Sequence, residues 1–154
     1  MLRDKSLIPL SHQHHNGLAL CVLTRQGLAR DRSEASAARL ARQVIERYEV
    51  ELANHFEVEE QVLFPECGEP KVVAELVAEH RAMERMVEEL RAAPSAEKLE
   101  EFCEMLSGHI RREERELFEQ VQKALPRELL DRMGGEIQRR AVQVCLKPDP
   151  TGQA

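Results

Sequence analysis

The sequence is poor in aromatic residues, which make up 3% of its 154 residues and include no tryptophan. No segment approaches the roughly 20 consecutive apolar residues that a membrane-spanning helix needs, and no stretch alternates between apolar and polar residues as a half-buried strand does. The N-terminus also lacks the pattern of a secretory signal. The sequence therefore predicts a cytoplasmic protein that neither crosses a membrane nor contains a β-sheet.

Paired cysteines are missing as well. Cys21, Cys67, Cys103 and Cys145 stand alone, with no Cys-x-x-Cys motif that would indicate a structural zinc site or a redox motif. We expect them to be reduced thiols in the core or on the surface. Negative charge exceeds positive charge in the sequence, and the formal net charge of −6 argues against nucleic acid or an anionic membrane surface as a partner.

Helix-forming residues are abundant instead, because charged residues make up 32% of the chain and Glu, Arg, Ala and Leu dominate it. Proline, glycine and serine separate five helical segments, at about 10–29, 34–64, 71–92, 96–124 and 127–146. Short connections make consecutive helices antiparallel. The sequence predicts an all-α protein, an up-down-up-down four-helix bundle over about 10–124 with an additional C-terminal helix. We expect one domain over 1–146 and a flexible tail over 147–154.

One ten-residue phrase occurs twice in this sequence. Residues 55–64 and 109–118 both read His-x-x-x-Glu-Glu-x-x-Leu-Phe. Residues i and i+4 of a helix lie one turn apart on the same face, so each copy presents an imidazole beside a carboxylate. The two pairs are His55 with Glu59 and His109 with Glu113.

Both pairs lie where the apolar stripe of their helix requires a core residue. The stripe runs through Leu52 and Val62 around the first pair, and through Leu106 and Leu117 around the second, in steps of three or four residues. An unpaired carboxylate buried at such a position is strongly destabilising. Two buried His–Glu pairs therefore need positive charge between them, which a bound metal ion supplies.

The other two helices offer matching histidines. His80 lies on the stripe of the third helix, between Leu76 and Met83, and the first helix offers His12, His14 and His15. At about 100° of rotation per residue, His15 lies within about 60° of the apolar residues Ile8, Leu18 and Val22, whereas His14 points roughly 100° away. We therefore choose His15 as the ligand and His12 as a second candidate, and we expect His14 on the surface or behind the ligands.

Imidazoles and carboxylates are ligands that suit iron, manganese or zinc. The set lacks the thiolates of structural zinc sites and the all-oxygen shell of calcium. Pairs of metal ions bridged by carboxylates are typical of non-haem iron in helical bundles. We expect iron, with manganese or zinc as alternatives.

With these motifs in this order, residues 10 to about 121 resemble the hemerythrin-like, or HHE cation-binding, domains. The resemblance implies a four-helix bundle that holds a non-haem di-iron centre with bridging carboxylates. It implies that Glu59 and Glu113 bridge the ions. It assigns His15 and His55 to one iron, and His80 and His109 to the other.

The sequence departs from the oxygen-carrying members of that family in two places. Those carriers have an aspartate five residues after the last histidine, where this sequence has Glu113 at four residues and Glu114 at five. Those carriers have a second histidine four residues after the one on the third helix, where this sequence has Glu84. Glu84 is therefore a less certain ligand, and so is His12, the second candidate on the first helix. We expect Glu60 and Glu114, each one residue beyond the ligand face, on the surface, and Glu51 and Glu79 as candidates for contacts behind the ligands.

The pattern is closer to relatives with four histidines and two glutamates, which sense iron or oxygen or repair iron centres. The resemblance implies a protein that binds iron and O₂, or a related diatomic molecule or anion, for sensing, storage or detoxification. The alternatives are an oxidoreductase or peroxidase-like enzyme, an enzyme that repairs iron centres, and a bundle whose metal is purely structural.

Overall fold

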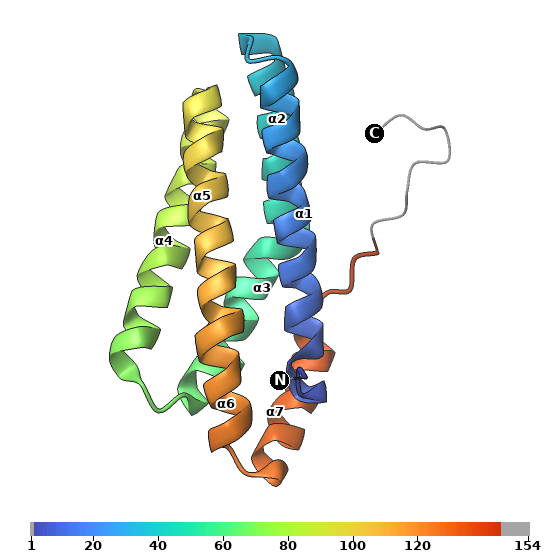
Figure 1. Cartoon of the computed structure of the whole chain (residues 1–154), viewed down its shortest axis with the longest axis vertical. Coiled ribbons are helices and arrows are strands. Elements are labelled where there is room, and N and C mark those ends of the chain that lie inside the picture. Colours follow the sequence, from blue (N-terminus) through green and yellow to red (C-terminus); the bar gives the residue numbers. More distant parts are fainter. Residues whose placement is uncertain (1, 146–154) are drawn as a thin grey trace.

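Four antiparallel helical rods form a bundle, and a further helix packs at one end of it (Figure 1). The computed structural model describes residues 2–145, and every regular element in that range is helical. The predicted fold class, an all-α four-helix bundle with an additional C-terminal helix, is confirmed. Among the described helices, none combines the length and the apolar character needed to cross a bilayer.

The first rod is the 3₁₀ turn η1 (Lys5–Leu7) followed by α1 (Ile8–Arg30). The third rod is α4 (Pro70–Ala92), an uninterrupted α-helix. The second and fourth rods contain π-helical turns. The second comprises α2 (Glu34–Arg47), η2 (Tyr48–Leu52), α3 (Ala53–Val58), η3 (Glu59–Leu63) and the 3₁₀ turn η4 (Phe64–Glu66). The fourth comprises α5 (Ala96–Arg112), η5 (Glu113–Leu117) and α6 (Phe118–Ala124).

Serine side chains begin two of the rods, as the sequence predicts. The hydroxyl of Ser33 accepts a hydrogen bond from the Ser36 amide at the start of α2, and Ser95 does the same for the Lys98 amide at the start of α5, both at 3.2 Å. Each bond satisfies one of the amides that the first turn of a helix leaves without a partner. These caps and the short connections set the antiparallel order of the rods.

The last helix, α7 (Arg127–Arg140), is shorter than the predicted segment 127–146. The side-chain amide of Asn54 ends it, because it donates to the Arg140 carbonyl and accepts from the Val142 amide, both at 2.9 Å. The chain from 141 to 145 then continues without helix. Leu146, where we expected the helix to end, and the predicted tail 147–154 lie outside the described residues.

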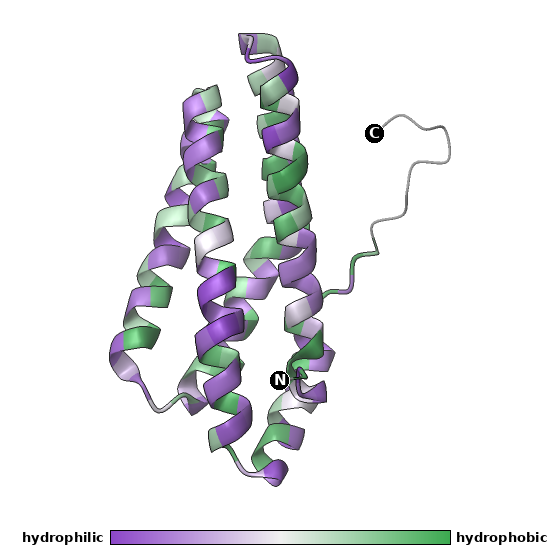
Figure 2. Ribbon diagram, in the orientation of Figure 1, coloured by the Kyte–Doolittle hydropathy of each residue, from purple (hydrophilic) through white to green (hydrophobic). Residues whose placement is uncertain are grey.

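Two apolar clusters fill the bundle, one above and one below its middle. Figure 2 shows hydrophobic residues spread along all the rods, interspersed with hydrophilic ones, as expected of amphipathic helices. The upper cluster includes Leu20, Phe56, Met83 and Ile110. The lower cluster includes Leu10, Val58, Leu76 and Leu117. The His–Glu pairs of the repeated phrase, on the second and fourth rods, lie between the two clusters. The buried histidines of the first and third rods, His14 and His80, lie there too.

A close backbone contact joins the N-terminal segment to α7. A Cβ atom added at Gly134 would lie 2.8 Å from both Cα and Cβ of Ser6, whereas one added at Gly135 would meet nothing within 4 Å. Asp4 and Arg127 form an ion pair beside this contact, with two N–O distances of 2.8 Å. Glycine at position 134 thus permits η1 to lie directly on α7.

This contact predicts opposite effects for two neighbouring substitutions. Gly134→Ala should destabilise the protein by about 1–3 kcal/mol, because backbone atoms cannot yield to the new methyl group. Gly135→Ala should stabilise it by up to about 1 kcal/mol, because alanine is the better helix former and the space is free. Urea denaturation of both variants measures the difference. Equal effects at the two positions would contradict the close contact at Gly134.

Candidate metal centre

Six buried histidine and glutamate side chains from all four rods meet in the middle of the bundle. Each is at most 3% exposed. They form two groups of four, in each of which one ligand atom per residue lies within 4.8 Å of the others. One group is His14, His55, Glu59 and Glu113, and the other is Glu59, His80, His109 and Glu113. The two carboxylates belong to both groups, so the two groups adjoin and share their glutamates.

The structure brings His14, and not His15, into this cluster. His14 is buried and its ring stacks on Phe118 with a centroid distance of 5.1 Å, whereas His15 is exposed. The sequence-based choice failed because the apolar residues used to orient the helix, Ile8 and Val22, are themselves about half exposed. The face of this rod that is buried follows steps of three and four. Its central line is Leu7, Leu10, His14, Gly17, Cys21, Thr24 and Leu28, and Ser6, Gln13, Asn16 and Leu20 are buried beside this line.

The two less certain candidates also lie outside the cluster. His12 is half-buried, and its Nε2 lies 3.1 Å from the carbonyl oxygen of Val144. Glu84 is partly exposed and pairs with Arg81 on the surface of α4. The other five residues that we predicted as ligands, namely His55, Glu59, His80, His109 and Glu113, are brought together.

A π-helical turn begins at the first glutamate of each copy of the repeated phrase. Glu59 opens η3, and Glu113 opens η5. A π turn adds one residue to the hydrogen-bonded turn of an α-helix, and such turns occur frequently at functional sites. The histidine of each copy lies in the α-helical turn just before it. The two copies thus place their side chains with the same local backbone geometry.

Each of the four histidines has an acceptor on its outer nitrogen, Nδ1. Neutral imidazole carries one proton, so an acceptor at Nδ1 places the proton there and leaves Nε2 with a free lone pair. The acceptors are Glu114 for His14 (3.0 Å), Gln13 Oε1 for His55 (2.8 Å), Glu60 for His80 (2.8 Å) and Glu79 for His109 (2.8 Å). All four Nε2 atoms therefore present lone pairs to the centre of the cluster.

Glu60 and Glu114 were expected on the surface, and this prediction is wrong. They are 20% and 29% exposed in their side chains, and each binds a histidine of a neighbouring rod. A residue one position beyond the ligand face is rotated by about 100°, which points it to the adjacent helix rather than to solvent. The second glutamate in both copies of the phrase is the sequence signal that could have identified them.

Glu79 and Glu51 were both candidates for contacts behind the ligands. Glu79 has this contact with His109, whose hydrogen bond lowers the pKa of the carboxyl group. Glu51 is buried but accepts from Asn16 at 2.8 Å and pairs with Arg47. Glu51 therefore joins the first two rods and contacts no histidine of the cluster.

Gln13, which the sequence did not single out, links His55 to the segment after α7. Its Nε2 donates to Asn54 Oδ1 at 3.1 Å and to the Val142 carbonyl at 2.9 Å. These two bonds occupy the amino group and leave Oε1 for His55 Nδ1. The ring orientation of His55 is therefore held by Gln13 of α1, which is itself held by Asn54 of α3 and by the Val142 carbonyl after α7.

The centre of the cluster contains acceptors without donors. Buried atoms without a hydrogen-bond partner include Nε2 of His14 and His55, Oε2 of Glu59 and both carboxylate oxygens of Glu113. The Nε2 atoms of His80 and His109 lie 3.1 Å apart, although both Nδ1 atoms face carboxylates. Lone pairs and negative charge that meet without protons between them are strongly unfavourable in a dry interior. Cations bound between them would satisfy every one of these atoms.

The protonation states agree with this interpretation. Burial lowers the pKa of His14 to about 4 and also lowers the pKa of His109, so both rings are neutral near pH 7. The pKa of Glu59 depends on positive charge beside it, because burial raises this pKa and His55 and His80 in their protonated form lower it well below its ordinary value. Neutral imidazole and ionised carboxylate are the forms in which these groups bind metals.

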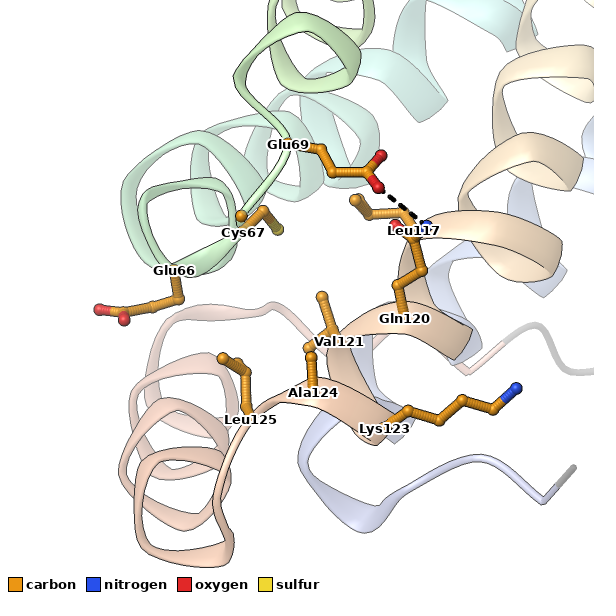
Figure 3. Close-up of a pocket in the computed structure, with 10 residues that line it drawn as sticks. Glu66, Cys67, Glu69, Leu117, Gln120, Val121, Lys123, Ala124 and Leu125 are labelled. Atoms are coloured by element: carbon orange, nitrogen blue, oxygen red, sulfur yellow. Dashed lines mark hydrogen bonds between the residues drawn. The ribbon is translucent and has the colours of Figure 1, made fainter.

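A separate cavity of about 450 Å³ opens at the lower end of the bundle (Figure 3). Cys67, Leu117, Val121 and Leu125 line it, and Figure 3 shows the hydrogen bond between Gln120 and Glu69 on its rim, 3.0 Å long. None of the six clustered residues lines this cavity, so it is distinct from the candidate metal centre.

Comparison with known proteins identifies a family. The model of a family described as "Hemerythrin HHE cation binding domain" matches residues 7–121, which include all four rods up to α6 and all six clustered residues. No curated protein and no solved structure has significant similarity to the chain.

Proposed function

Because the chain belongs to the hemerythrin HHE cation-binding family, we propose that it is a non-haem di-iron protein that binds O₂ or a related diatomic molecule or anion. Its role would be in sensing, storage or detoxification. One observation above all supports this proposal. Six buried metal-ligand groups, four imidazole nitrogens with lone pairs and two carboxylates, converge without protons between them.

The ligands divide naturally between two ions. His14 and His55 would bind one ion, His80 and His109 the other, and Glu59 and Glu113 would be shared, in keeping with the two groups of four. Two histidines and a carboxylate with open positions remaining are typical ligands of non-haem iron. Bound iron supplies redox chemistry and a coordination position for a small ligand.

The residues of the chain itself orient the ligands and keep water away. Glu60, Glu79, Glu114 and Gln13 hold the four rings through Nδ1 and make Nε2 more basic. Phe56 and Phe64 stack on the ring of His80, with centroid distances of 4.1 and 5.6 Å. The apolar clusters above and below exclude bulk water, which strengthens every electrostatic interaction at the centre.

The contact between Glu60 and His80 predicts a graded effect. Glu60→Gln keeps the shape of the side chain but removes the charge behind the imidazole, so we expect the affinity for iron to fall about 10-fold, within the range of about 10–100-fold known for such partners. Glu57→Gln, on the exposed side of the same rod, is the matched control and should leave the affinity unchanged. Competition with a chromogenic chelator measures both values. Equal affinities for the two variants would argue against a role for Glu60.

Metal analysis of the protein purified without added metal tests the proposal. We expect about two iron ions per chain, together with an absorption band that azide changes. Zinc or manganese in place of iron, or a spectrum indifferent to azide and O₂, would contradict the proposed function and favour a structural metal. Steady consumption of O₂, H₂O₂ or NO by the reduced protein would favour the enzymatic alternative over a binding protein.

A further inference from the structure

Two of the four cysteines face each other in the upper apolar cluster. Cys21 on α1 and Cys103 on α5 are 1% and 0% exposed, and both are free thiols. The Cys21 thiol donates a hydrogen bond to the carbonyl oxygen of Cys103, with a sulfur–oxygen distance of 3.7 Å, and the two thiols lie close enough for each to shift the pKa of the other. The sequence separates them by 82 residues, so only the packing of α1 against α5 brings them together.

Polar groups accompany this pair inside an otherwise apolar cluster. Each thiol has a hydroxyl residue of the opposite helix near it: Ser107 lowers the pKa of Cys21 and Thr24 lowers that of Cys103, while the Thr24 hydroxyl itself donates to the Leu20 carbonyl at 2.8 Å. Both hydroxyl residues are at most 2% exposed. A buried cysteine that only fills space behaves as a small apolar residue and needs no such partners. The four side chains form a buried polar site between two helices, which we call the dithiol site.

The dithiol site also favours the reactive form of one thiol. The neighbouring Cys103 side chain, together with Ser107 and the positive charges of Arg25 and Arg111, lowers the pKa of Cys21 to about 7 against the opposing effect of burial. The same coupling raises the pKa of Cys103. The thiolate is the nucleophilic form of cysteine, and redox-active thiols often have a second thiol beside them. Because both thiols are buried, oxidation here needs a small oxidant that enters when the helices open locally.

We propose that Cys21 and Cys103 are a redox-active pair that hydrogen peroxide converts into a disulfide between α1 and α5. The Cys21 thiolate attacks one peroxide oxygen, the O–O bond breaks, and after protonation one water leaves and a sulfenic acid remains. Cys103 then attacks the sulfur of the sulfenic acid, the S–S bond forms and the second water leaves. Two thiols lose two electrons and two protons, and one peroxide becomes two waters.

The disulfide would join the two helices that carry His14 and His109. Cys21 follows His14 by seven residues, and at 1.5 Å per residue this places the dithiol site about 10 Å along the bundle from the candidate metal centre. Gly17 lies between the two sites, where a Cβ would meet Ile110 at 3.0 Å. Formation of the disulfide needs no metal, so the inference stands apart from the proposed function.

The test uses the full-length chain with Cys67→Ser and Cys145→Ser, which leaves only the two buried thiols. The protein is treated with H₂O₂, quenched with catalase, unfolded and alkylated. We expect a mass 2 Da lower than that of the reduced chain, no alkylation, and a linked peptide pair containing positions 21 and 103. Dithiothreitol should restore two alkylation sites.

Further variants in that background separate the pair from general oxidation. Cys21→Ser should leave Cys103 reduced, so that it is still alkylated after the same treatment. In Cys103→Ser, Cys21 can be oxidised to the sulfenic acid, but no intramolecular disulfide should form. If both thiols remain alkylated, or if they are oxidised to sulfinic acids or to dimers, the proposal is overturned. The test on the unsubstituted pair does not depend on the folding of these variants.

Discussion

His14→Gln should reduce the iron content of the protein, whereas His15→Gln should not change it. His14 places a free Nε2 within 3.9 Å of both Glu59 and Glu113, and its Nδ1 is held by Glu114. His15 is exposed and contributes to neither group of ligand atoms. We expect the affinity of one ion to fall by at least the roughly 100-fold that loss of a supporting contact can cause, and the content to fall from about two ions to about one.

The two variants form a matched pair, because they change neighbouring residues of one helix in the same way. Glutamine keeps much of the volume of histidine against Phe118 and so limits the effect on packing. Iron content is measured by elemental analysis, and circular dichroism checks that both variants keep the helical content. Loss of iron in His15→Gln with full iron in His14→Gln would show that the first helix has a different rotation in the iron-bound protein.

Glu113→Gln should stabilise the metal-free protein and abolish its stabilisation by metal. Both carboxylate oxygens of Glu113 are buried without a hydrogen-bond partner, and one of them lies against His109 Nε2, which carries a lone pair. The neutral amide removes a buried charge and can donate to that nitrogen. We expect the free energy of unfolding without metal to rise by about 1–3 kcal/mol, since an unsatisfied buried group destabilises by about that amount.

The same substitution removes a shared ligand from both ions. A metal present at 1,000 times its dissociation constant stabilises the folded protein by about 4 kcal/mol, and Glu113→Gln should lose this stabilisation. Glu116→Gln lies three residues along on the same helix and is 66% exposed, so it should change either value by less than about 0.5 kcal/mol. Thermal unfolding with and without ferrous iron measures both effects. A metal-free Glu113→Gln protein that is less stable than the parent would contradict the unfavourable burial of the Glu113 carboxylate.

The sequence by itself determined the helices and most of the cluster. Strong apolar stripes on the second, third and fourth rods identified His55, Glu59, His80, His109 and Glu113 as core-facing, and all five are buried together. Periodicity is a local property, and these stripes contain large apolar residues such as Leu76 and Leu106 that make the buried face unambiguous. The repeated phrase added the chemistry, because it placed carboxylates where burial requires a cation.

Only the tertiary structure decided the rotation of the first helix and the contacts between helices. The buried face of α1 includes Gly17 and Thr24, whose weak apolar character hides the stripe, while the apolar Ile8 and Val22 are about half exposed. Glu60 and Glu114 hold histidines of other rods, and Cys21 meets Cys103 across the bundle. Such contacts depend on how far each helix turns and slides against its neighbours. Packing of whole surfaces sets that arrangement, and no spacing within one segment encodes it.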